Sequence, residues 1–158
     1  MATDNGSNRI RESWDRLSGR PGGRRLFSLL IGRMVPYTGS IRPHVEELRD
    51  GYARISIRDR RAVRNHLRSI HAIAIMNLAE VTGGLALNYW LPADARAILT
   101  GLSIEYLKKG RGTLTAEASI TLPRTTDRSE YEYETIVRDD AGDEVARARA
   151  RWLVGPAE

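Results

Sequence analysis

The chain has 158 residues, of which 41% are hydrophobic and 28% charged, so we expect one domain with an ordinary core. No apolar run approaches the roughly 20 residues that a membrane span needs, and the first residues lack the apolar core of a signal peptide. The sequence has no cysteine, which excludes disulfides, thiolate metal ligands and a cysteine nucleophile. These features predict a cytoplasmic protein without a membrane span.

The net charge is +5, and the excess of positive charge lies in the first 70 residues. A basic segment can attract nucleic acid, anionic lipid or a ligand that carries phosphate. All but two of the 25 basic residues are Arg, a bias that is also typical of a GC-rich genome. Because no recognition motif and no run of stacking aromatic residues accompanies the charge, we expect no nucleic-acid partner.

Residues 1–36 are predicted to form an N-terminal tail and helical extension. Residues 1–7 have the composition of a disordered tail, residues 8–17 suit a short polar helix, and the Gly- and Pro-rich residues 19–23 break it. Residues 24–34 predict an amphipathic helix that packs on the core as a lid rather than on a membrane, and Pro36 ends it. Its apolar residues at helical spacing are Leu26, Phe27, Leu30, Ile31 and Met34.

Residues 37–156 predict one α+β domain. Residues 41–48 and 52–58 alternate as two strands around an Asp-Gly turn, and residues 70–89 form a long helix that is apolar on nearly all sides and therefore buried. Alternation then predicts four more strands, which implies a curved antiparallel sheet around the helix. The residues expected to share a face are Ile98, Leu102, Ile104 and Tyr106; Leu114, Ala116, Ala118, Ile120 and Leu122; and Ala146, Ala148, Ala150, Trp152 and Val154, with a weaker strand at 131–137.

Two features of the long helix point to chemistry. Glu80 lies between Ala79 and Val81, where a carboxylate is costly to bury. It either pairs with an arginine or reaches solvent, or it acts as a general base or nucleophile of tuned basicity. The start of the helix presents unsatisfied backbone N–H groups that suit a polarised carbonyl, with Ser69 as the expected N-cap.

The block N-H-L-R-S-I-H-A-I-A-I-M-N-L-A-E-V-T-G-G, residues 65–84, resembles the active-site segment of hotdog-fold acyl-CoA thioesterases. The resemblance is greatest to the group that includes the phenylacetyl-CoA-pathway thioesterases. Those proteins show Asn, a short loop, His-Gly-Gly at the start of the central helix, and an acidic residue nine positions after the His. Here Asn65 lies six residues before His71, and Glu80 lies nine after it. Residues 101–112 resemble the strand and turn that follow, so the similarity covers about residues 41–154.

This resemblance implies a hotdog fold and hydrolysis of an acyl-CoA thioester. It implies that the Ala72 N–H polarises the thioester carbonyl, that Glu80 activates water or attacks the thioester, and that Asn65 positions water or substrate. His71 would shape the helix start. No cofactor is implied, because CoA enters as part of the substrate. The chain has Ala72-Ile73 where the family has Gly-Gly, which keeps the N–H group and adds bulk beside the thioester.

The spacing of the two key residues has a consequence of its own. Ala72 and Glu80 are eight residues apart, which on one helix separates them by about 12 Å along the axis. They cannot act on the same carbonyl from one chain, so a shared site requires Ala72 of one protomer and Glu80 of another across a two-fold interface. We therefore expect a homodimer, with a homotetramer as the alternative.

The other candidate functional residues are a group of basic residues and the three histidines. Lys108, Lys109 and Arg111 form a basic turn that is either a solvated surface or a site for the CoA phosphates. The three histidines show no metal-ligand spacing, so no metal site is expected.

Two alternative functions stay open. His66 lies fourteen residues before Glu80, the spacing of hotdog dehydratases that act on hydroxyacyl thioesters, although the proline-containing loop of those enzymes is missing. The bulk of Ala72-Ile73 also suits a non-catalytic hotdog module that binds acyl-CoA or another lipid.

Overall fold

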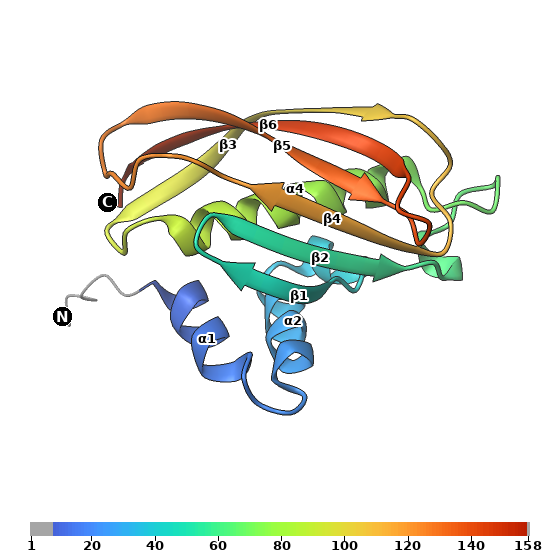
Figure 1. The fold of residues 1–158 in the computed structure, drawn as a ribbon, viewed down its shortest axis with the longest axis horizontal. Coiled ribbons are helices and arrows are strands. Elements are labelled where there is room, and N and C mark those ends of the chain that lie inside the picture. The colour runs from blue at the N-terminus through green and yellow to red at the C-terminus, as the bar shows by residue number, and fades with distance from the viewer. Residues whose placement is uncertain (1–7, 158) are drawn as a thin grey trace.

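A six-stranded antiparallel sheet curves around one long helix, α4 (Ala72–Trp90), as Figure 1 shows. The computed structural model describes residues 8–157, so the tail expected at residues 1–7 lies outside the described residues. The predicted order of two strands, a helix and four strands is confirmed. The strands are β1 (His44–Arg49), β2 (Tyr52–Arg58), β3 (Ala95–Tyr106), β4 (Thr113–Ser119), β5 (Ser129–Arg138) and β6 (Glu144–Pro156), and they lie in the order β1-β2-β4-β5-β6-β3.

The alternating residues of β4 and β6 place the core where the sequence predicts it. Their inward side chains are small, with Ala116 on β4 and Ala148 on β6 both buried. Small side chains let α4 lie close to the sheet, and further along, the stacked rings of Trp152 and Tyr133, with centroids 6.5 Å apart, lie against Gly83 and Gly84 of the helix. None of the helices described within residues 8–157 is long and apolar enough to cross a membrane.

One predicted face of β3 is wrong. Leu102, Ile104 and Tyr106 lie opposite the inward alanines of β6, as expected, but the register shifts between Leu99 and Gly101. A bulge adds one residue to the strand, and the side chains on its two sides then alternate out of phase. Ile98 therefore points away from the core and is 52% exposed.

The N-terminal helices are α1 (Arg9–Leu17) and α2 (Gly23–Met34), close to their predicted bounds. A third helix, α3 (Pro36–Ser40), was not predicted, because Pro36 was interpreted only as a helix end. The fixed φ of proline also suits the first residue of a new helix. The expected boundary after residue 36 thus falls inside α3, and that division of the chain stays a prediction.

Helix α2 buries less of its apolar surface than its spacing predicts. Phe27 and Ile31 are buried, and the Ser28 hydroxyl accepts a hydrogen bond of 2.9 Å from the Val45 N–H of β1. Leu30 and Met34 are exposed, as is Leu26, because the helix rests on the sheet edge along a narrow line centred on residues 27, 28 and 31. Helix α2 therefore also has apolar side chains on the side that faces away from the sheet.

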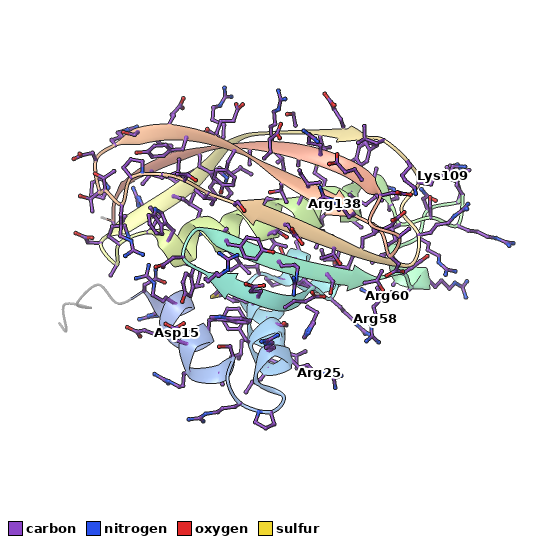
Figure 2. All side chains as sticks on the ribbon, viewed as in Figure 1. Asp15, Arg25, Arg58, Arg60, Lys109 and Arg138 are labelled. Carbon is purple, nitrogen blue, oxygen red and sulfur yellow. The ribbon has the colours of Figure 1, made fainter. Side chains whose placement is uncertain are left out.

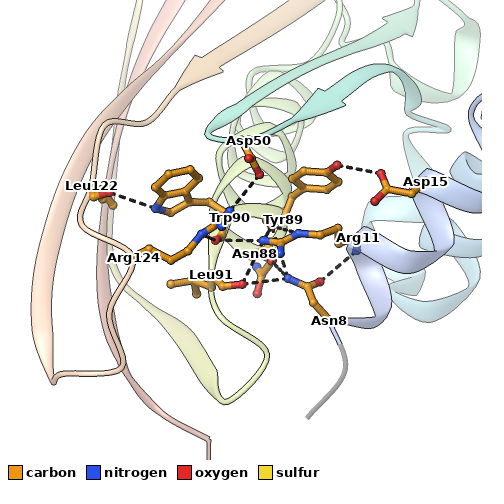
Figure 3. A network of polar contacts seen from close by, with 10 residues as sticks. All are labelled: Asn8, Arg11, Asp15, Asp50, Asn88, Tyr89, Trp90, Leu91, Leu122 and Arg124. Carbon is orange, nitrogen blue, oxygen red and sulfur yellow. Dashed lines mark hydrogen bonds and ion pairs between the residues drawn. The ribbon is translucent and has the colours of Figure 1, made fainter.

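A polar network closes the C-terminal end of α4 (Figure 3). The last carbonyls of a helix have no partner within the helix. Here Arg11 of α1 donates to the carbonyls of Tyr89 (2.9 Å) and Trp90 (3.1 Å), and Asn8 donates to that of Leu91 (3.1 Å). Arg124 donates to the Trp90 carbonyl from the opposite side (3.0 Å). These contacts fix α1 to α4, and positive charge at a helix C-terminus is itself favourable.

Arg11→Ala should lower the free energy of unfolding by about 1–3 kcal/mol, because charged hydrogen bonds to otherwise unpaired carbonyls are lost. Chemical denaturation measures this difference. Arg16→Ala, an exposed position on the same helix, is the control and should change stability by less than about 0.5 kcal/mol. Equal effects of the two substitutions would contradict the role given to Arg11.

Candidate functional site

One stripe of α4 is left uncovered by the sheet and by the N-terminal helices. Ile73 is 47% exposed, and Met76 and Glu80 follow on the same side of the helix, each partly exposed. The stripe borders a mainly apolar cavity of about 320 Å³, named here the Glu80 cavity. Its lining residues are Val35, Tyr37, Thr38, Ile73, Met76, Asn77, Glu80 and Leu102.

Glu80 is the one ionisable carboxylate in this lining. Burial raises the pKa of its carboxyl above the ordinary value of 4.5. No ion pair joins Glu80 to an arginine anywhere in residues 8–157, so pairing does not explain its position. Glu80 Oε1 lies 3.7 Å from where a Cβ on residue 84 would be, and that Cβ would also lie only 3.3 Å from the Trp152 ring, so Gly84 lets the helix pack closely against this ring beside the carboxylate. Glu80 thus lines a cavity whose volume is large enough for a small ligand group.

The start of α4 is capped by His71, and the prediction of Ser69 is wrong. His71 has extended backbone, and its Nδ1 accepts the N–H of Ile73 at 3.1 Å. Ser69 lies two residues too early and is buried, with its hydroxyl donating to Asn65. His71 therefore shapes the helix start, as expected. The N–H of Ala72, the first helical residue, has no hydrogen-bond partner within the described part of the chain.

Asn65 organises the loop that precedes the helix. Its Oδ1 accepts hydrogen bonds from the Leu67 N–H (2.9 Å), the Ser69 N–H (3.3 Å) and the Ser69 hydroxyl (3.1 Å). This is a local side-chain turn of the kind that Asn commonly forms. The Oδ1 atom is thereby used by the loop, so a contact with substrate would come from the Nδ2 amide.

Sequence reasoning missed the residues that connect this site to the rest of the fold. Asn77, one turn before Glu80, accepts a hydrogen bond from the Thr38 hydroxyl (3.2 Å) and donates to the Tyr37 carbonyl (3.3 Å). Tyr106 at the end of β3 donates its hydroxyl to the Ala72 carbonyl (2.8 Å). A buried polar residue in the apolar helix was the signal for Asn77, but its partners lie on α3.

The other candidates lie around the same end of the molecule. Lys108 is held by Asp139 (2.7 Å) and Asp143 (2.8 Å), while Lys109 and Arg111 are exposed. His66 is exposed in the loop before α4 and does not line the Glu80 cavity. No group of three or more His, Asp or Glu in residues 8–157 is placed to hold a metal ion.

Comparison with known proteins assigns the chain to a family. The model of the family described as Domain of unknown function (DUF4442) matches residues 23–154, so the chain belongs to that family. A protein solved as genomics APC5556 is 30% identical, with a TM-score of 0.81 over 95% of this chain and 98% of its own. A search of the curated proteins found no match.

Two further solved structures carry informative names. PA5026 from Pseudomonas aeruginosa, a probable thioesterase, is 22% identical over 84% of this chain and 95% of its own, with a TM-score of 0.76. A mutant of the thioesterase SAV0944 from Staphylococcus aureus is 15% identical over 77% of this chain and 100% of its own, with a TM-score of 0.69. These likenesses show the hotdog fold, which confirms the predicted fold class. The roles of Glu80, Ala72, Asn65 and His71 in catalysis stay predictions.

Glu80→Gln should leave the protein folded and at least as stable as wild type at pH 7. When the pKa of a carboxyl is higher in the folded chain than in the unfolded chain, its ionisation lowers the free energy of unfolding of the protein. This loss grows as the pH rises from the unfolded pKa through the folded pKa. Glutamine does not ionise and so avoids this loss. The difference in free energy of unfolding between Glu80→Gln and wild type should therefore favour the variant at pH 7 and become smaller as the pH is lowered to 4. Urea unfolding at both pH values measures it, with exposed Glu130→Gln as control. A Glu80→Gln variant that is less stable at pH 7 than at pH 4, relative to wild type, would contradict this account.

Proposed function

We propose that this protein hydrolyses an acyl-CoA thioester to a free acid and CoA. The observation that carries the proposal is the Glu80 carboxylate, unpaired within the described residues and of raised pKa, beside an apolar cavity on the uncovered stripe of α4. The names of PA5026 and SAV0944 support hydrolysis of a thioester by proteins of this fold. CoA as the thiol and the residues that act are the finer part of the proposal. The reaction needs no cofactor.

In the proposed reaction, ionised Glu80 removes a proton from water, and the hydroxide oxygen adds to the thioester carbonyl carbon. The free N–H of Ala72 donates to the carbonyl oxygen as it becomes negative. The tetrahedral intermediate then expels the CoA thiolate, which takes up the proton held by Glu80. In the second form of the reaction, Glu80 attacks the carbonyl itself and expels the CoA thiolate; water then hydrolyses the resulting anhydride to the free acid and the Glu80 carboxylate, and the proton released is taken up by the thiolate. Both forms need the carboxylate ionised.

A second copy of the chain would complete this site. Within residues 8–157, strand β3 pairs with β6 alone and leaves its other edge unpaired over twelve residues, which is unusual for an isolated protein. The uncovered stripe of α4, with half-exposed Ile73, lies beside this edge near Leu102. Pairing of β3 with its copy about a two-fold axis would cover both features and bring Ala72 of one chain toward Glu80 of the other. A homodimer is therefore proposed, with the tetramer as the alternative.

Thiol release over a panel of short, long and aromatic acyl-CoAs tests the function. The chain has no cysteine, so a thiol reagent gives no signal from the protein. We expect hydrolysis by wild type and by Glu130→Gln, and a loss of at least a hundredfold in kcat in Glu80→Gln. Because burial raises the pKa of Glu80, kcat/KM should fall with decreasing pH at a value above 4.5.

Wild-type kcat in folded Glu80→Gln would remove Glu80 from the mechanism. Hydrolysis of no member of the panel, together with tight binding of acyl-CoA, would overturn the enzymatic proposal in favour of a binding module. Loss of water from a 3-hydroxyacyl thioester, without thiol release, would instead indicate a dehydratase.

A further inference from the structure

Four arginines surround a cavity near the end of β2, away from Glu80. Arg25 reaches it from α2, Arg42 from the loop before β1, and Arg58 and Arg60 from the end of β2 and the residues that follow. Figure 2 shows Arg58 and Arg60 beside the end of β2 and Arg25 below them, beside α2. The cavity has a volume of about 560 Å³ and is named here the arginine cavity; its other lining residues are His44, Glu46, Ser56 and Thr113.

The positive charge of this cavity is not balanced by the protein. None of the four arginines forms an ion pair with a carboxylate within residues 8–157. Glu46, the carboxylate in the lining, pairs with Arg54 at 3.0 Å. Burial, and then the nearby positive charge of Arg42, lower the pKa of Arg60. Like charges held together cost free energy, and an arginine cluster of this kind is typical of sites that bind phosphate oxygens.

An apolar groove of about 640 Å³ continues from the arginine cavity and shares Arg25, Arg42 and His44 with it. Its walls are formed by α2, α3 and the loop before β1. The two helices approach closely here, since a Cβ on Gly39 would overlap the Gly32 carbonyl. An apolar groove with arginine at its rim can accept a planar aromatic ring, on which guanidinium groups stack. The residues that make it apolar are Leu29, Gly32, Pro36, Gly39 and Pro43.

A chain of contacts connects this region with the proposed thioester site. The Glu80 cavity shares Tyr37, Ile73 and Asn77 with a second cavity of about 380 Å³, which extends past His71 to Ser40. Arg60 donates a hydrogen bond to the Ser40 carbonyl and thus lies between that second cavity and the arginine cavity. The Glu80 cavity, the second cavity and the arginine cavity thus follow one another around the start of α4, with the Arg60–Ser40 contact between the last two.

We propose that Arg25, Arg42, Arg58 and Arg60 bind the phosphate groups of the CoA nucleotide, with its adenine ring in the adjoining groove. This inference rests on the proposed function and names the subsite of its substrate. It replaces the basic turn of Lys108, Lys109 and Arg111 as the principal phosphate site. Two aspartates already neutralise Lys108, whereas the arginine cavity gathers four arginines without an ion-pair partner in residues 8–157 around one open cavity.

Calorimetric titration with CoA tests the subsite without any hydrolysis, because CoA carries the phosphates but no thioester. Arg42→Gln and Arg58→Gln, whose side chains make no hydrogen bond or ion pair within residues 8–157, should each weaken CoA binding about tenfold. Both should leave the binding of pantetheine, which lacks the nucleotide, unchanged. Lys109→Gln and Arg111→Gln are the matched controls and should change CoA affinity less than twofold. In turnover, the two arginine variants should raise KM and leave kcat unchanged.

The outcomes separate this inference from the proposed function. Binding of CoA that depends on Arg42 and Arg58, without hydrolysis of any acyl-CoA, would support the subsite and overturn the enzymatic proposal. Hydrolysis with a KM that responds to Lys109 or Arg111 but not to the arginines would overturn the subsite alone. Inorganic diphosphate that binds as tightly as CoA would overturn the assignment of the groove to adenine.

Discussion

The structure depends on the burial of α4, a helix that is apolar on nearly every side. Such a helix is stable in water only if other elements cover it all round. The sheet covers one side with the small inward residues of β4 and β6, and α1 closes the C-terminal end. Helix α3 covers a further strip through the contacts of Asn77 with Thr38 and Tyr37. The stripe of Ile73, Met76 and Glu80 is what one chain leaves open.

In the proposed dimer, this uncovered stripe would belong both to the thioester site and to the interface between the two chains. An apolar stripe that contains one carboxylate suits a site that is closed by a second chain. Closure would bury apolar surface and would also remove water from around the carboxylate. The unpaired edge of β3 lies along the same side. In this proposal the substrate would reach Glu80 beside the interface, and the arginine cavity would bind its phosphates.

The parts of the fold set by strict alternation could be predicted from the sequence. Ala116 and Ala148 were placed on the inward face because period two survives along regular strands. The face of Ile98 could not be predicted, since one bulged residue in β3 inverts the pattern and leaves no mark in composition. The cap of α4 was misplaced by two residues because serine is the commoner cap, while in this loop the Ser69 hydroxyl is taken by Asn65.

The candidate site was also predictable from the sequence only in part. Glu80 was identifiable as a carboxylate within an apolar helix, and the spacing from Ala72 was readable from residue numbers. The cavity beside Glu80 was not, because it is built by α3, whose short sequence has no helical periodicity and whose position depends on contacts distant in the chain. The arginine cavity likewise combines α2, a loop and the end of β2. Patterns within one sequence carry little information about which elements distant in the chain lie side by side.

The most direct test of the account is the activity of a mixed dimer of Ala72→Pro and Glu80→Gln chains. Proline removes the N–H at the first helical position, which tolerates it, and His71 already has the extended backbone that a following proline requires (φ −62°, ψ 140°). Thiol release would be measured on dimers purified through a different tag on each chain.

If Ala72 and Glu80 of different chains share one site, both homodimers are inactive and the mixed dimer regains about half the wild-type activity, because one of its two sites is intact. A mixed dimer as inactive as its parents would contradict a site built from two chains. Full activity of the Ala72→Pro homodimer would show that the N–H takes no part.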